Sequence, residues 1–128
     1  MTFLLPSNHF AYLHTHWDRE WYLPFRQYQI RLAQVVDQIL ADLEAQRYPC
    51  FCLDGQTVLL EDYVAVRPEQ AGRLRQLIAS SQLTVGPWYV APDSYLVGAE
   101  SLIRNLQRGL AMSAAWGCHQ FCGYLPDT

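Results

Sequence analysis

The feature that most constrains the fold of this chain is the regular alternation of short apolar runs with longer amphipathic segments. The apolar runs, which are typical of buried strands, lie at residues 10–13, 48–53, 82–85 and 121–125. Between them, apolar residues at every third or fourth position predict helices after Pro24, after Pro68 and from Ala99 to about Gly117, with a short helical turn at 57–64. The order β-α-β-α-β-α-β predicts an α/β fold with a parallel sheet and right-handed crossovers.

The spacing of the strands bears on the architecture. Their centres lie near residues 12, 51, 84 and 124, whereas an eight-fold barrel uses roughly 31 residues for each strand and helix. The longer units favour part of a barrel with enlarged loops, and a small doubly wound sheet is the alternative. Four strands cannot close a barrel, so we expect residues 1–128 to be an incomplete domain that self-associates through open sheet edges.

Composition excludes several classes of protein. A net charge of −3 and 51% hydrophobic residues argue against disorder and against a nucleic-acid partner. No apolar run approaches the roughly 20 residues of a membrane span, and the N-terminus lacks a signal-peptide pattern, so we expect a cytoplasmic protein without membrane contact. All nine basic residues are arginine, which excludes a lysine nucleophile within this chain.

The four cysteines allow two interpretations. Cys50 and Cys52 lie in an apolar run, and in the absence of a secretion signal buried free thiols are favoured. Cys118, His119 and Cys122 could instead supply half of a zinc site, although no second pair at suitable spacing accompanies them.

Polar and aromatic residues gather where the predicted strands end. Because the carboxyl ends of parallel strands meet at one edge of a sheet, we expect these side chains to converge on one face. They are His14, His16, Asp18 and Trp21 after the first strand, Asp54 after the second, Trp88 and Asp93 after the third, and Asp127 after the fourth.

The first of these groups has the spacing of a metal site. His14, His16 and Asp18 stand two residues apart, so on extended backbone their side chains point to the same side. Two imidazoles and a carboxylate suit a divalent transition metal, with zinc favoured. The alternative is a pair of histidines bonded to backbone carbonyls, with a capping aspartate.

Aromatic side chains stand beside the acids at these strand ends. Ring faces that stack on a sugar, next to carboxylates that bind its hydroxyls, are typical of carbohydrate sites. The alternative is that some of these rings pack the rim of the barrel. The residues concerned are Trp17, Trp21, Tyr22, Trp88, Tyr89 and Tyr95.

Four segments together resemble a known enzyme family. HTHWDREWY at 14–22, LDGQTVLLEDY at 53–63, GPWYVAPDSYLVGAESLIRNL at 86–106 and GYLPDT at 123–128 are similar to the N-terminal part of glycoside hydrolase family 38. These enzymes are zinc-dependent retaining α-mannosidases, and the likeness is greatest to a bacterial branch that includes mannosylglycerate hydrolases. The resemblance implies the N-terminal half of a (β/α)7-type catalytic barrel whose substrate is an α-mannoside or a mannosylated small molecule.

The resemblance also implies the metal chemistry. His16, Asp18 and Asp127 match zinc ligands of the family, and Asp127 also matches the catalytic nucleophile. His14 matches a position close to the metal, behind its ligands. Zinc beside the nucleophile would keep the carboxylate ionised and offset charge that develops on the sugar.

Substrate contacts follow from the same comparison, with one departure. Trp21 matches a tryptophan that packs against the bound sugar, and we expect Asp54, Trp88 and Asp93 to bind substrate as well. Ser94 stands where many relatives have glutamate, so any role of that acid is missing.

Two further family features are expected beyond Thr128, namely the acid/base carboxyl and a fourth zinc ligand. We therefore expect the isolated chain to be inactive. One alternative is a metal-dependent amidohydrolase-like barrel, which also carries a His-x-His pattern after its first strand. Another is a non-catalytic truncated or sugar-binding remnant.

Overall fold

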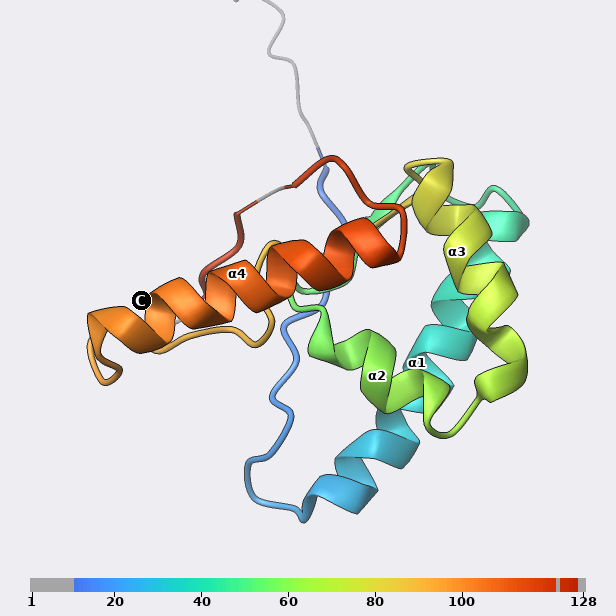
Figure 1. Cartoon of the computed structure of the whole chain (residues 1–128). Helices are drawn as coiled ribbons and strands as arrows, with labels where there is room; N and C mark the ends of the chain where they lie inside the picture. The colour runs from blue at the N-terminus through green and yellow to red at the C-terminus, as the bar shows by residue number, and fades with distance from the viewer. Residues whose placement is uncertain (1–10, 122, 127–128) are drawn as a thin grey trace, which may run out of the picture.

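The computed structural model describes residues 11–121 and 123–126, so Phe10, Cys122 and Asp127 lie outside the described residues. The helices and strands follow the predicted alternation (Figure 1). In chain order they are α1 (Phe25–Glu44), β1 (Phe51–Cys52), α2 (Val58–Val64), the 3-10 turn η1 (Pro68–Gln70), α3 (Ala71–Ala79), β2 (Leu83–Thr84) and α4 (Ala99–Ala115).

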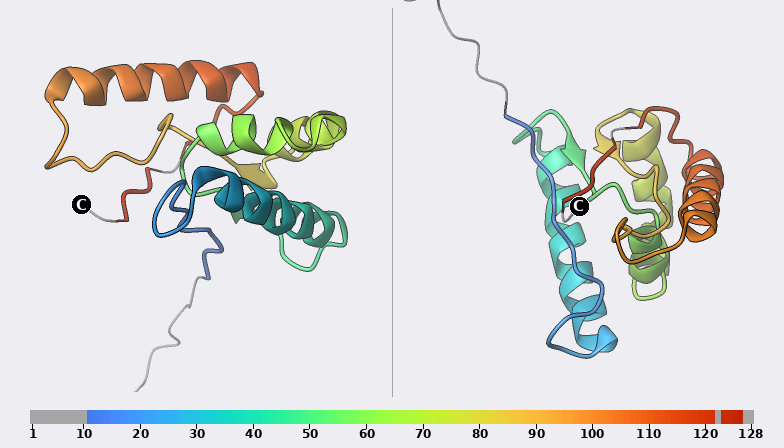
Figure 2. Two further views of the ribbon diagram at one scale, coloured as in Figure 1. Left: turned by 90° about the horizontal axis from the view of Figure 1, so that it is seen from below. Right: turned by 90° about the vertical axis from the view of Figure 1, so that its left-hand side faces the viewer.

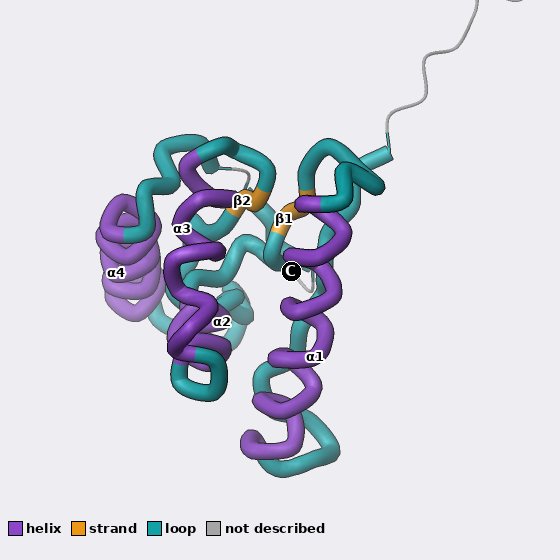
Figure 3. The backbone as a smooth tube through the Cα atoms, turned by 90° about the vertical axis from the view of Figure 1, so that its right-hand side faces the viewer, coloured by secondary structure: helices purple, strands orange, loops and turns teal. Residues whose placement is uncertain are grey.

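The sheet is parallel, as predicted, but small. β1 and β2 pair with Phe51 opposite Leu83 and Cys52 opposite Thr84 (Figure 3). A single bridge joins His14 to Cys52 on the other edge of β1. There the Cys52 amide donates to the Leu13 carbonyl at 2.9 Å. The prediction of an α/β chain with a parallel sheet is therefore confirmed for its two central strands.

The first and fourth predicted strands differ from the expectation. The described part of the first, residues 11–13, is exposed rather than buried, with Tyr12 and Leu13 at 49% and 41%. It pairs with β1 only at its end, where His14 forms the bridge to Cys52. Residues 121 and 123–126 are not in strand conformation. Instead the Tyr124 ring packs beside His14, with ring centroids 4.6 Å apart.

The core forms where the long amphipathic helix α1 packs on α2 and α3. α1, the α2–α3 pair and α4 form three successive layers in Figure 2, with the two strands at one end of the core. Burying apolar side chains between these layers is the main favourable contribution to folding. The largest fully buried apolar side chains are Tyr63, Leu32, Leu40, Leu43, Leu53, Leu59, Leu60, Leu74 and Leu83.

Helix α4 packs through small residues rather than through its apolar stripe. Its buried residues are Gly109 and Ser113, whereas Ile103 and Leu110 of the predicted stripe are 53% and 37% exposed. A Cβ atom at Gly109 would lie 2.1 Å from the Pro87 carbonyl oxygen. Such close backbone contact requires a residue without a side chain, so packing geometry overrides the hydrophobic pattern here.

Candidate functional site

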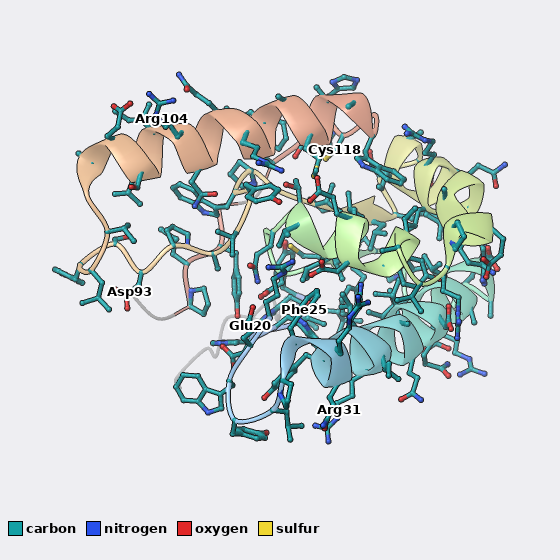
Figure 4. All side chains as sticks on the ribbon, turned by 60° about the horizontal axis from the view of Figure 1, so that its bottom comes forward. Glu20, Phe25, Arg31, Asp93, Arg104 and Cys118 are labelled. Atoms are coloured by element: carbon teal, nitrogen blue, oxygen red, sulfur yellow. The ribbon has the colours of Figure 1, made fainter. Side chains whose placement is uncertain are left out.

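A cavity of about 280 Å³ lies at the carboxyl ends of the strands and brings together four predicted site residues, His16, Asp18, Asp54 and Asp93. Figure 4 shows Asp93 on the loop before α4 and Glu20 on the loop that leads into α1. The complete lining consists of residues 16–20, Asp54, Gln56, residues 90–93 and Pro126.

A tight turn after β1 delivers the central part of this lining. Asp54 and Gly55 both have positive φ, at 54° and 61°. Aspartate tolerates this left-handed region better than most residues and glycine enters it freely. Space is also tight at Gly55, because a Cβ there would lie 3.2 Å from the Cβ of Tyr124. The turn therefore positions Asp54 and Gln56 within the cavity wall.

His16 and Asp18 lie close enough to share a metal ion. The distance from His16 Nε2 to Asp18 Oδ1 is 3.8 Å, and both side chains are partly exposed. Two ligand atoms of a tetrahedral zinc ion lie roughly 3.4 Å apart, so this pair needs only a small adjustment. Within residues 11–121 and 123–126 no group of three or more metal-ligating side chains occurs. The third predicted ligand, Asp127, lies outside the described residues.

Asp54 is a buried carboxylate, and only one of its two oxygens accepts hydrogen bonds that the structure shows. Its exposed fraction is 1%. Oδ2 accepts hydrogen bonds from the Trp17 amide, at 2.8 Å, and from the Gln56 side chain. Oδ1 is buried and has no hydrogen-bond partner among the described residues. Burial raises the pKa of Asp54, and the two donated hydrogen bonds partly oppose that rise.

Two contacts anchor the loops on either side of the cavity. Arg19 donates from Nε and Nη2 to the two carboxylate oxygens of Asp62 on α2, at 2.7 and 3.0 Å. This pair raises the pKa of Arg19 and ties the 16–20 loop to the core. On the other side, Asn105 of α4 accepts from the amides of Tyr89 and Val90 at 2.9 and 3.0 Å.

Three predicted site residues lie outside the cavity lining. Trp21 is 72% exposed. Trp88 is partly buried, and its indole nitrogen has no partner among the described residues. The His14 ring stacks on Tyr12 at 6.0 Å, and its Nδ1 lies 2.9 Å from the Thr15 carbonyl oxygen. His14 thus contacts neighbouring rings and a backbone carbonyl in the described structure.

Sequence reasoning missed Gln56 and Arg19 as parts of the site. Gln56 is 2% exposed and its side chain bonds to three of the segments that line the cavity. Its sequence signals are its place in the segment 53–63 described above and its position in the turn after a predicted strand, and neither predicts its hydrogen bonds. Arg19 and its buried partner Asp62 stand in the segments 14–22 and 53–63 described above, but nothing in either segment predicts that the two side chains pair.

The described cysteines form no disulfide, as expected. Cys52 is buried, as predicted, and so is Cys118, but the prediction of a buried thiol is wrong for Cys50, which is exposed. The Cys118 thiol lies 3.1 Å from the Gln120 carbonyl oxygen, to which it can donate. Cys122, the other thiol of the suggested half-site, lies outside the described residues. No helix in the part of the chain that the structure describes is long and apolar enough to cross a membrane.

Fold and cavity together define an α/β protein whose polar site lies at the carboxyl ends of parallel strands. Residues 6–128 match the N-terminal domain of glycosyl hydrolases family 38, so the chain belongs to this family. This family membership argues against the alternative that the chain is part of an amidohydrolase-like barrel.

Individual relatives agree with this assignment. The chain is 40% identical over 117 residues to a protein of Halalkalibacterium halodurans named "Putative mannosylglycerate hydrolase". It is 41% identical, with a TM-score of 0.87, to the crystal structure of an alpha-mannosidase from Enterococcus faecalis V583. To a second family 38 structure from Enterococcus faecalis, the chain is 37% identical, with a TM-score of 0.83.

The match covers most of this chain and a small part of each relative. It extends over 90% of the chain and 13% of the Halalkalibacterium protein. For the two Enterococcus structures it extends over 91% of the chain and 13% and 14% of those chains.

Proposed function

We propose that residues 1–128 form the N-terminal part of the catalytic barrel of an α-mannosidase. The whole enzyme would hydrolyse an α-mannoside or a mannosylated small molecule with retention of configuration. Family membership supports this proposal, as do the names of the matched relatives. The observation that carries it is the cavity, because four acids and one imidazole from three separate loops line it together.

His16, Asp18 and Asp127 are the residues we propose as zinc ligands. The 3.8 Å separation of the first two side chains supports this assignment, as does their common place in the cavity wall. An imidazole and carboxylates form a donor set that suits zinc. Bound zinc supplies Lewis-acid stabilisation of the charge that develops during sugar transfer.

Asp127 is the proposed nucleophile. In a retaining mechanism its carboxylate attacks the anomeric carbon and forms a glycosyl ester while the leaving group takes a proton from a second carboxyl. Water then attacks the ester, and the second carboxyl accepts a proton from that water. We assign this second carboxyl to no residue of this chain.

Asp54 and Asp93 are proposed to bind sugar hydroxyls. The unpartnered Oδ1 of Asp54 supports this role, because a buried acceptor without a donor is unfavourable until a ligand supplies one. Trp21 offers an exposed ring for stacking on the sugar, and Trp88 an indole N–H donor. His14 would support the metal site from behind its ligands.

The test is the zinc content and α-mannosidase activity of the full-length protein that carries this chain. We expect a chelator to remove both and added zinc to restore them. His16→Ala should abolish both, whereas the control His119→Ala, at an exposed histidine away from the cavity, should retain them. Full zinc occupancy in His16→Ala would contradict the ligand assignment, and zinc loss in His119→Ala would favour the cysteine-histidine site.

A further inference from the structure

Gln56 is a single buried side chain that bonds to three loops of the cavity. Its Nε2 donates to the Trp17 carbonyl at 3.0 Å and to the Asp54 carboxylate. Its Oε1 accepts from the Ala91 amide at 2.8 Å. These partners come from the loop after the first predicted strand, the turn after β1 and the loop after β2. With 2% exposure, Gln56 has little access to water that could replace these bonds.

The chemistry of the three partners fixes the orientation of the amide. A carbonyl and a carboxylate both require a donor, and a backbone N–H requires an acceptor. A flipped Gln56 would place oxygen against oxygen at two contacts and nitrogen against nitrogen at the third. Only one orientation satisfies all three bonds, so the side chain is held in a defined position.

The backbone of Trp17 is held on both sides by this group of hydrogen bonds. Gln56 bonds to its carbonyl oxygen, and Asp54, itself bonded to Gln56, accepts from its amide at 2.8 Å. Both backbone polar groups of Trp17 are therefore held by the turn after β1. Trp17 stands directly between His16 and Asp18 in the sequence. Because its backbone is held, the backbone positions from which the His16 and Asp18 side chains extend are restricted as well.

We propose that Gln56 is a positioning residue that aligns the His16–Asp18 pair with Asp54 and with the loop that carries Asp93. This inference rests on the proposed function of the cavity. Hydrogen bonds that orient ligands from behind matter because displacements of about 1 Å at a reacting centre can cost roughly 100-fold in rate. Loss of such outer contacts typically costs about 10- to 100-fold in metal affinity or activity.

Gln29 provides a matched control. It is also a buried glutamine, 6% exposed, and its Nε2 donates to a backbone carbonyl, that of Asp62, at 3.0 Å. It lies on α1, away from the cavity lining. Gln29→Met and Gln56→Met each replace a buried amide with a thioether side chain of similar length. A general effect of losing a buried amide should therefore appear in both variants.

The experiment compares these two variants in the full-length protein. We expect Gln56→Met to lower kcat/KM and zinc affinity about 10- to 100-fold, and Gln29→Met to change each less than about two-fold. Gln56→Glu keeps an acceptor for the Ala91 amide but places a carboxylate against Asp54, so we expect a loss at least as large as in Gln56→Met. Equal kcat/KM and zinc affinity in Gln56→Met and Gln29→Met would overturn the proposal.

Amide hydrogen exchange gives a readout that does not depend on turnover. We expect the Ala91 amide to exchange faster in Gln56→Met and to keep its protection in Gln29→Met and Gln56→Glu, because both of these retain its acceptor. Unchanged Ala91 protection in Gln56→Met would overturn the positioning role even if the protein were active. If wild-type protein failed to hydrolyse α-mannosides while these exchange differences appeared, the proposed function alone would fail.

Discussion

Replacement of Gly109 by alanine tests how α4 is held against the loop that leads into the cavity. The new Cβ would lie 2.1, 2.3 and 2.4 Å from the Pro87 carbonyl oxygen, the Trp88 carbonyl carbon and the Tyr89 amide nitrogen. All three are backbone atoms, so no side-chain rotation can relieve the overlap. Either α4 or the 87–89 segment must move.

Two opposing effects decide the sign of the change in stability. Glycine-to-alanine replacement within a helix is ordinarily favourable by about 1 kcal/mol. Overpacking typically costs about 1–3 kcal/mol, and overlap with three rigid atoms belongs at or above the upper limit. We therefore expect a net destabilisation of about 2 kcal/mol, which corresponds to a Tm lower by about 4–8 °C for a domain of about 200 residues.

Thermal unfolding of the full-length protein measures this effect, with Gly72→Ala as the control. Gly72 lies within α3, and a Cβ added there would meet nothing within 4 Å. We expect Gly72→Ala to be neutral or stabilising by up to about 1 kcal/mol. Equal Tm values for Gly109→Ala and Gly72→Ala would refute the reasoning that close backbone contact holds α4 in place.

Three further predictions concern the cavity and the chain. Asp62→Ala should destabilise the protein by about 1–3 kcal/mol in urea unfolding, since Arg19 loses its paired acceptor; an unchanged midpoint would contradict this anchor. Asp54 has a raised pKa, so its contribution to stability falls as pH rises from about 4 through the folded pKa. Asp54→Asn should therefore gain stability relative to wild type over that range, and a pH-independent difference would oppose it. Residues 1–128 alone should not hydrolyse an aryl α-mannoside; turnover at the rate of the full-length protein would disprove this.

Secondary structure was predictable where local signals and packing agree. α1 and the Pro68 turn follow directly from apolar periodicity and from proline at a helix start. The first predicted strand is exposed because pairing depends on neighbours that a local apolar run does not reveal. The prediction that the apolar stripe of α4 is its buried face was wrong for a related reason. The buried residues are Gly109 and Ser113, and a hydropathy pattern does not identify small residues as a packing surface.

The site was predictable to the extent that parallel strands gather polar residues at one edge. Of the residues that this rule groups, His16, Asp18, Asp54 and Asp93 line one cavity, whereas His14, Trp21 and Trp88 lie outside its lining. It could not single out Gln56, because two of the hydrogen-bond partners of this side chain lie more than thirty positions away in the sequence.

The most direct test of the proposed mechanism is the stereochemistry of hydrolysis. The full-length protein, loaded with zinc, would be given an aryl α-mannoside, and the first anomer of mannose released would be followed by proton NMR before mutarotation. We predict that α-mannose appears first, because the proposed nucleophile, Asp127, would form a glycosyl ester that water opens with a second inversion. Initial release of β-mannose, or no turnover with zinc bound, would contradict this mechanism.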